Sequence, residues 1–168
     1  RPDIRLAASG KVYSAYTMAA NLALGADWCN AARGYMFALG CIQALNCHTG
    51  RCPSGVATQD PRRGNKLDVE HKIQRVYNYH KNTLDALQNL LEASGLKHPS
   101  ELGPEHIVRR VSKTEVHSYM DLFPFLEPGA LLEGKTGLTI FDKYWEFARS
   151  DTFEPPEFIL KLRETKLR

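Results

Sequence analysis

Three of the four cysteines in this sequence, Cys41, Cys47 and Cys52, lie within twelve residues, and no cysteine follows them. The fourth, Cys29, lies earlier in the chain. A disulfide framework in a small secreted domain usually distributes its cysteines more evenly. Local clustering in a chain of 168 residues therefore favours metal or redox chemistry.

The spacing of this cluster, Cys-x5-Cys-x4-Cys, leaves three interpretations open. An iron–sulfur cluster needs cysteine thiolates, although the common ferredoxin spacings differ from this one. Zinc prefers closer pairs of ligands, and it would take His48 as its fourth ligand. Alternatively, the cysteines are structural, either reduced or disulfide-bonded. The surrounding loop is rich in Gly, Pro, Ser and Thr, so backbone N–H groups can approach the sulfur atoms and stabilise thiolates.

The elements that must position the cysteines follow from hydrophobic pattern and turn residues. Residues 4–7 predict a short buried strand followed by a Gly turn. A helix is expected over residues 14–24, with Gly25 just beyond its end. A second strand over residues 26–29 and a second helix from residue 35 complete a βαβα order. This order is the unit of parallel sheets and (β/α)8 barrels.

Two turns follow the two predicted strands. The first turn contains Ser9, Gly10 and Lys11, and the second turn contains Ala32, Arg33 and Gly34. Each offers unhindered backbone N–H groups and one positive charge, and the second opens a helix, where anions are favoured. Ligands of α/β folds bind at the carboxyl ends of strands, and barrel enzymes often hold a phosphate between their last two such turns. One turn alone is weak evidence, but the pair predicts a phosphate site.

Helices dominate the expected structure after the cysteine loop. A polar linker over residues 60–65 leads to a long amphipathic helix over 69–94, which Gly95 ends. On its apolar stripe, His80 is expected to be a core residue rather than a metal ligand. Further helices are predicted after Gly103-Pro104, from a Ser112/Glu115 capping box to Leu122, over 139–148, and after Pro155-Pro156 with Phe158, Ile159 and Leu162 inward.

Composition excludes several classes of protein. Hydrophobic residues make up 43% and charged residues 24%, which is ordinary for a globular domain and excludes intrinsic disorder. A net charge of +3 with dispersed Lys and Arg gives no indication of a nucleic-acid partner. No stretch approaches the apolar length of a membrane span. Residue 1 is Arg and no signal-peptide pattern follows, so we expect a processed chain or a piece of a longer protein.

The stretches IRLAASGK and ALGADWCNAARGYMFALGCIQALNCHTGRCPSGVATQDP resemble the FMN-binding glutamate synthase family. The cysteine spacing and the GVATQD that follows it are the most specific features. The resemblance is dense over residues 4–61, weaker to about residue 132, and slight beyond. It implies an α/β ancestry, with residues 1–60 as the last two βα units of an FMN-binding (β/α)8 (TIM) barrel. Residues 61–168 would form a helical region, so the chain would be mainly α by residue count.

The resemblance also implies chemistry. Family members reduce 2-iminoglutarate, formed from 2-oxoglutarate and ammonia, to L-glutamate, with electrons passing through a [3Fe–4S] cluster to FMN. Matched residue by residue, Cys41, Cys47 and Cys52 would be the cluster ligands, and the first and second turns would bind the FMN phosphate. Cys29 matches no ligand. Relatives often have Gly in place of Ser9, and Gly or Ser in place of Ala32, so both departures keep the side chain small.

The resemblance covers only a small part of such an enzyme. The first six barrel strands and a glutaminase region are missing, so no complete catalytic site is expected and no catalytic residue is assigned. The expected partners are the rest of the barrel, in the same polypeptide or another chain, and an electron donor, with the protein in the cytoplasm. The alternative is an isolated non-catalytic fragment, a structural module whose open strand edges favour self-association.

Overall fold

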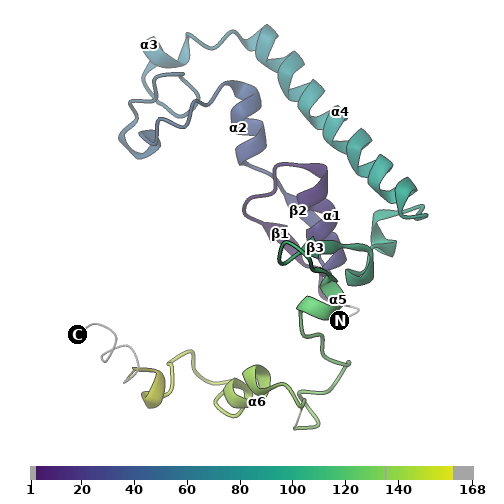
Figure 1. The fold of residues 1–168 in the computed structure, drawn as a ribbon. Coiled ribbons are helices and arrows are strands. Elements are labelled where there is room, and N and C mark those ends of the chain that lie inside the picture. The colour runs from purple at the N-terminus through teal and green to yellow at the C-terminus, as the bar shows by residue number, and fades with distance from the viewer. Residues whose placement is uncertain (1–2, 135, 161–168) are drawn as a thin grey trace. The chain divides into compact units, whose positions relative to one another are not determined.

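A computed structural model describes residues 3–134 and 136–160 of the chain. The chain forms two compact units, Arg1–Leu122 and Phe123–Arg168. Helices predominate within the described residues, and the two sheets there have two strands each, so these residues form no closed barrel (Figure 1). The prediction of a mainly helical chain is confirmed. The predicted boundary at residue 60, between a barrel portion and a helical region, stays a prediction.

The predicted strand–helix–strand–helix order is present in the first unit. It consists of β1 (Ala7–Ser9), α1 (Ala15–Ala23), β2 (Trp28–Asn30) and α2 (Arg33–Leu39). The two strands are parallel, with Ala7 opposite Trp28 and Ser9 opposite Asn30. Both lie later than predicted, because the Asp27 carboxylate accepts the Leu6 N–H at 2.7 Å before the ladder begins.

Local capping signals explain the ends of α1. The Ser14 hydroxyl accepts the Thr17 N–H at 3.3 Å, and the Thr17 hydroxyl accepts the Ser14 N–H at 3.1 Å. This reciprocal capping box fixes the start of the helix. Gly25 follows the helix with a φ of 99°, a left-handed conformation that glycine adopts without strain. Ser14 and Gly25 had predicted these ends, whereas the part of Thr17 in the capping box was not predicted.

The long helix α4 (Val69–Ala93) packs against both α1 and α2. Asp68 caps its first turn by accepting the His71 N–H, and Gly95 follows its end with a φ of 73°. The core of the unit consists of Leu87 and Ile107, which pack against one face of α1. The side chains on this face are all alanines, Ala15, Ala19, Ala20 and Ala23. Small side chains on α1 allow this close approach.

The placement of His80 in the core was wrong. The residue is exposed on α4, where Nδ1 of its ring lies 2.5 Å from the Tyr35 hydroxyl of α2. The apolar stripe of α4 is wider than the surface that α1 and α2 cover, so its margin, including Ile73 and Tyr77, stays exposed. A polar partner on α2 satisfies the ring at this margin.

The helix predicted from Ser112 to Leu122 was also wrong. Residues there form the antiparallel strands β3 (Val108–Arg110) and β4 (Val116–Ser118), and only α5 (Tyr119–Leu122) is helical. The Ser112 hydroxyl does accept the Glu115 N–H at 3.1 Å, as in a capping box, but the bond closes a hairpin turn instead. Serine makes the same local hydrogen bond in turns and at helix starts, so the pattern is ambiguous.

Short elements complete the described chain. The first unit also contains η1 (Cys47–Thr49), α3 (Pro61–Gly64), η2 (Pro99–Glu101) and η3 (Pro104–His106). In the second unit α6 (Thr139–Trp145) is shorter than predicted, and a helical turn covers residues 157–160. The Phe147 and Phe158 rings pack with centroids 4.6 Å apart, whereas Leu162 lies outside the described residues. No helix among the described residues is long and apolar enough to cross a membrane.

Replacing Leu87 by alanine should lower the free energy of unfolding by about 2 to 4 kcal/mol, because it leaves a cavity against α1. Leu87 is 6% exposed, whereas Leu84 on the same helix is 45% exposed. The matched Leu84→Ala change should cost less than about 1 kcal/mol. Urea denaturation followed by circular dichroism measures both, and equal losses would contradict this position of the core.

Candidate cofactor site

The structure brings the first and second turns to one edge of the β1–β2 pair. Ser9 ends β1 opposite Asn30, which ends β2, and the strands are parallel. Each turn therefore leaves the carboxyl end of its strand beside the other. In the first turn Gly10 and Lys11 have φ values of 91° and 55°. A lysine in the left-handed region is uncommon and carries strain, which is found disproportionately at functional positions.

The second turn leads directly into α2. Ala32 precedes the helix without a side-chain cap, and Arg33 begins it with an exposed side chain. Gly34 is buried, and a side chain placed on it would collide with the Tyr79 hydroxyl and ring. The absence of a side chain at Gly34 thus lets Tyr79 of α4 pack against the second turn, a reason that sequence alone did not reveal.

A pocket of about 440 Å³ joins the second turn to the cysteine loop. Ala32 and Arg33 line it together with Cys41 and Cys47. Cys52 and the first turn do not belong to its lining. The structure thus places one predicted phosphate turn and two of the three predicted cluster ligands around one cavity.

Cys52 lies in a loop that stabilises its thiolate. Its side chain is 7% exposed, and its sulfur lies 3.4 Å from the Ser54 hydroxyl. Hydrogen bonds from that hydroxyl, and from the backbone N–H groups of Ala57, Ser54 and Val56, lower the pKa of Cys52 to about 7. Burial instead raises the pKa of the Cys29 thiol. Of these two thiols, Cys52 favours the thiolate, the form in which cysteine binds metals, and Cys29 favours the neutral thiol.

The GVATQD stretch closes the cysteine loop. The Thr58 hydroxyl donates to the Gly50 carbonyl at 2.5 Å, and the Asp60 carboxylate caps α3 by accepting the Arg62 N–H at 2.9 Å. Gly55, with a φ of 78°, lies so close to the Arg63 carbonyl that no side chain fits there. The sequence analysis did not predict this role of Thr58. The only available signal was that threonine hydroxyls readily form hydrogen bonds with nearby backbone.

Within residues 3–134 and 136–160, no group of three or more His, Cys, Asp or Glu side chains lies close enough together to hold one metal ion. In a cluster each thiolate binds its own iron, so the sulfur atoms need not meet at one point. The Cys41 sulfur accepts a hydrogen bond from the Gln43 N–H at 3.4 Å. The Cys52 sulfur likewise accepts hydrogen bonds from N–H groups of its own loop. Such bonds support cluster thiolates.

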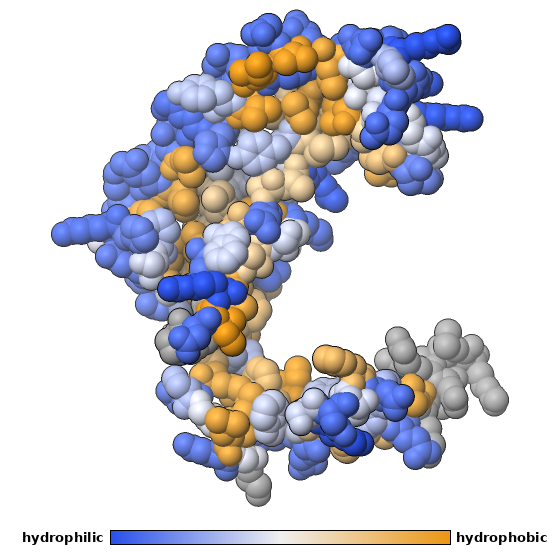
Figure 2. Space-filling model, turned by 180° about the vertical axis from the view of Figure 1, so that it is seen from behind, coloured by the Kyte–Doolittle hydropathy of each residue, from blue (hydrophilic) through white to orange (hydrophobic). Residues whose placement is uncertain are grey.

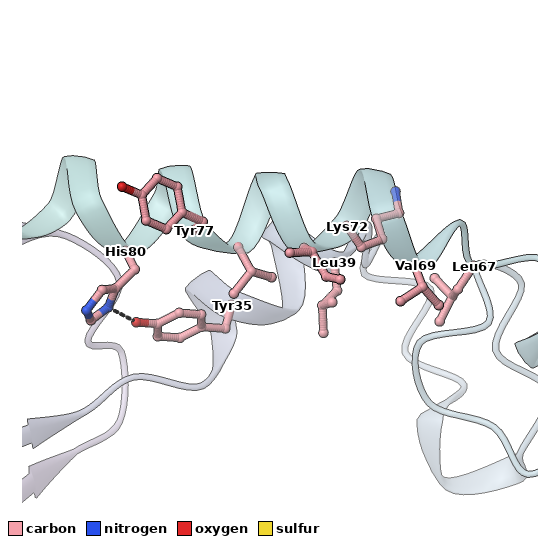
Figure 3. A pocket seen from close by; sticks show the side chains of 9 residues that line it. Tyr35, Leu39, Leu67, Val69, Lys72, Tyr77 and His80 are labelled. Carbon is pink, nitrogen blue, oxygen red and sulfur yellow. Dashed lines mark hydrogen bonds between the residues drawn. The ribbon is translucent and has the colours of Figure 1, made fainter.

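A separate open groove of about 600 Å³ runs between α2 and α4. Figure 3 shows its side chains, with the Tyr35–His80 hydrogen bond at one end. Apolar residues dominate it, and Figure 2 shows that exposed apolar side chains lie among hydrophilic ones on the side of the molecule it draws. None of the predicted site residues lines this groove, although Tyr35 directly follows Gly34.

The low pKa of Cys52 makes a pH dependence expected in cofactor-free protein. The thiolate form is favoured by folding, so its contribution to stability is complete above the ordinary thiol pKa and is lost as the pH falls through about 7. Ultraviolet thiolate absorbance, taken as the difference from Cys52→Ala, should show a midpoint near pH 7. Ser54→Ala should move that midpoint upward. An unchanged midpoint would mean that the Ser54 hydroxyl does not stabilise the thiolate.

Comparison with known proteins gives one family and several relatives. A family described as "conserved region in glutamate synthase" matches residues 1–97. The glutamate synthase large subunit-like protein YerD of Bacillus subtilis is 47% identical over 110 residues, 66% of this chain and 21% of that protein. The archaeal glutamate synthase [NADPH] of Methanocaldococcus jannaschii is 36% identical over 96 residues, 57% of this chain and 19% of that protein.

A eukaryotic relative aligns with a longer stretch of this chain than either of these two proteins. The glutamate synthase [NADH] of Schizosaccharomyces pombe is 28% identical over 139 residues, covering 79% of this chain and 6% of that protein. The chain spans about a fifth of the length of the bacterial and archaeal relatives. No solved structure matches significantly.

Proposed function

Because this chain belongs to the glutamate synthase family, we propose that it is a segment of an oxidoreductase that makes L-glutamate. The reaction is the reduction of 2-iminoglutarate, formed from 2-oxoglutarate and ammonia. FMN and a [3Fe–4S] cluster are the proposed cofactors. The βαβα region is proposed to be the last two βα units of a (β/α)8 barrel whose remainder, in the same polypeptide or a partner chain, completes the active site.

One observation supports this proposal above the others. The second turn, which leaves the carboxyl end of β2, shares a pocket with Cys41 and Cys47. The proposed phosphate site and the proposed cluster site would then be neighbours, which supports a role in electron transfer between the two cofactors. Neither the turn nor the cysteines alone would support both cofactors.

The residues of this chain have distinct proposed roles. FMN, when bound, supplies the hydride chemistry. Lys11 and Arg33 provide positive charge for its phosphate, the Gly10 backbone allows close approach, and Gly34 forms the second turn between Arg33 and Tyr79. Cys41, Cys47 and Cys52 hold the cluster, with Cys52 already favouring the thiolate. Groups that bind the flavin ring and the substrate carboxylates belong to the remainder of the barrel.

Two further features belong to the proposal. An electron donor protein or subunit delivers electrons to the cluster. The compartment is the cytoplasm, where reduced thiols persist, in agreement with the four free cysteines Cys29, Cys41, Cys47 and Cys52.

Cofactor analysis of the intact protein that contains this chain tests the proposal. We expect flavin identified as FMN, and iron and acid-labile sulfide in the ratio of a [3Fe–4S] cluster. Glutamate formation from 2-oxoglutarate and ammonium with a chemical reductant should accompany them. A colourless protein without iron or flavin would overturn the proposal and support a structural, self-associating module.

A further inference from the structure

We propose that Tyr79 of α4 holds the first and second turns at the spacing that the FMN phosphate needs. Tyr79 would be a positioning residue, since its side chain acts through the two turns and not on the cofactor itself. This inference rests on the proposed function. It assigns part of the flavin site to a helix that follows the cysteine loop and lies outside the strand pair.

The first contact is a hydrogen bond to the connection that continues the first turn. The Tyr79 hydroxyl donates to the Tyr13 carbonyl at 3.0 Å. Tyr13 lies two residues after Lys11, in the segment between β1 and α1. This segment is also fixed at its far end, where the Thr17 hydroxyl accepts the Tyr13 N–H at 3.2 Å. The Tyr79 hydroxyl therefore limits how far the first turn can move.

The second contact is packing against the second turn. The Tyr79 hydroxyl and ring occupy the space that a side chain on Gly34 would take. One side chain thus touches Gly34 and binds the segment that carries Lys11. Because the hydroxyl makes the first contact and the ring contributes to the second, the distance between the turns depends on the length and rigidity of this tyrosine.

Neighbouring contacts keep Tyr79 in this place. Its ring meets the Tyr35 ring edge-on, with centroids 5.0 Å apart. The Tyr35 hydroxyl is in turn bonded to His80, the next residue of α4 (Figure 3). One turn earlier on α4, the Arg75 guanidinium donates to the Phe37 carbonyl of α2 at 3.3 Å. Together these contacts fix α4 against α2, so Tyr79 has a rigid base from which to position the first turn.

Cavities beside Tyr79 leave the first turn room to move once the tyrosine hydroxyl is gone. A pocket of about 120 Å³ and another of about 420 Å³ are both lined by Tyr13 and Tyr79. If the hydroxyl is removed, the Tyr13 carbonyl loses its hydrogen bond to Tyr79 and the turn can shift into this space. A phosphate bound by charges on both turns is sensitive to that shift, because fixed donors are effective only at the correct spacing.

The test compares FMN with riboflavin, which lacks the phosphate, in the intact protein. Flavin fluorescence titration should show that Tyr79→Phe raises the dissociation constant of FMN about tenfold while that of riboflavin changes less than about twofold. Gly34→Ala, which pushes Tyr79 aside without altering its hydroxyl, should reduce the same FMN preference. The matched control is Tyr77→Phe, since Tyr77 is 58% exposed on the same helix. It should leave both affinities unchanged.

The outcomes separate this inference from the proposed function. An unchanged preference for FMN over riboflavin in Tyr79→Phe would overturn the positioning role while leaving the phosphate site intact. Equal weakening of both flavins would overturn it too, because it would show that Tyr79 only supports the fold. If the wild-type protein itself shows no preference for FMN, the proposed phosphate site fails and the inference fails with it.

Discussion

Cys52→Ala should reduce the iron and acid-labile sulfide of the intact protein to less than about a tenth of the wild-type content. The loop around Cys52 stabilises a thiolate through the Ser54 hydroxyl and backbone N–H groups, which lower the pKa of the thiol to about 7. Alanine removes the sulfur donor that these groups prepare for iron. Cys47→Ala should have the same effect, because three thiolates are the minimum for the proposed cluster.

Cys29→Ala is the matched control for this loss. Cys29 lies on β2, and burial raises the pKa of its thiol, so the same substitution removes a thiol without removing a ligand. Iron, sulfide and visible absorbance should stay at the wild-type level in this variant. If Cys52→Ala also kept its iron, the assignment of Cys52 as a ligand would be wrong.

The parts of the fold that the sequence predicts correctly have local causes. The ends of α1 depend on Ser14, Thr17 and Gly25, all within the helix or beside it. The hairpin of β3 and β4 depends on pairing between Arg109 and His117, which no local signal specifies. The Ser112 hydrogen bond is the same in a helix cap and in this turn, so only the strand pairing decides between them.

In the candidate site, too, the features with local causes were predictable and those that depend on distant residues were not. The first and second turns were predictable as neighbours, because a βαβ order with parallel strands brings the carboxyl ends of the strands to one edge. The reason for Gly34 was not predictable, since Tyr79 is 45 residues away in sequence and reaches it only through the packing of α4 on α2. The low pKa of Cys52 was predictable in kind, from a loop rich in small residues, but the particular donors were not.

Arg33→Glu should raise the dissociation constant of FMN in the intact protein by about 30- to 100-fold at low salt. Arg33 is exposed and begins α2 at the second turn, where its guanidinium is proposed to attract the phosphate. A carboxylate at the same position would repel the phosphate instead. Because solvent screens an exposed charge, the effect should shrink as salt is added. Riboflavin, which carries no phosphate, should bind nearly as before.

The pocket that Arg33 shares with Cys41 and Cys47 extends this prediction to the cluster. A negative charge at position 33 favours the more oxidised, less negative state of a neighbouring cluster, so its reduction potential should become more negative. Arg62→Glu on α3 is the control, because Arg62 is exposed but does not line that pocket. Flavin titration and a redox titration followed by electron paramagnetic resonance measure the two effects. If FMN binding weakens while the potential stays constant, the phosphate site and the cluster are farther apart than the shared pocket indicates.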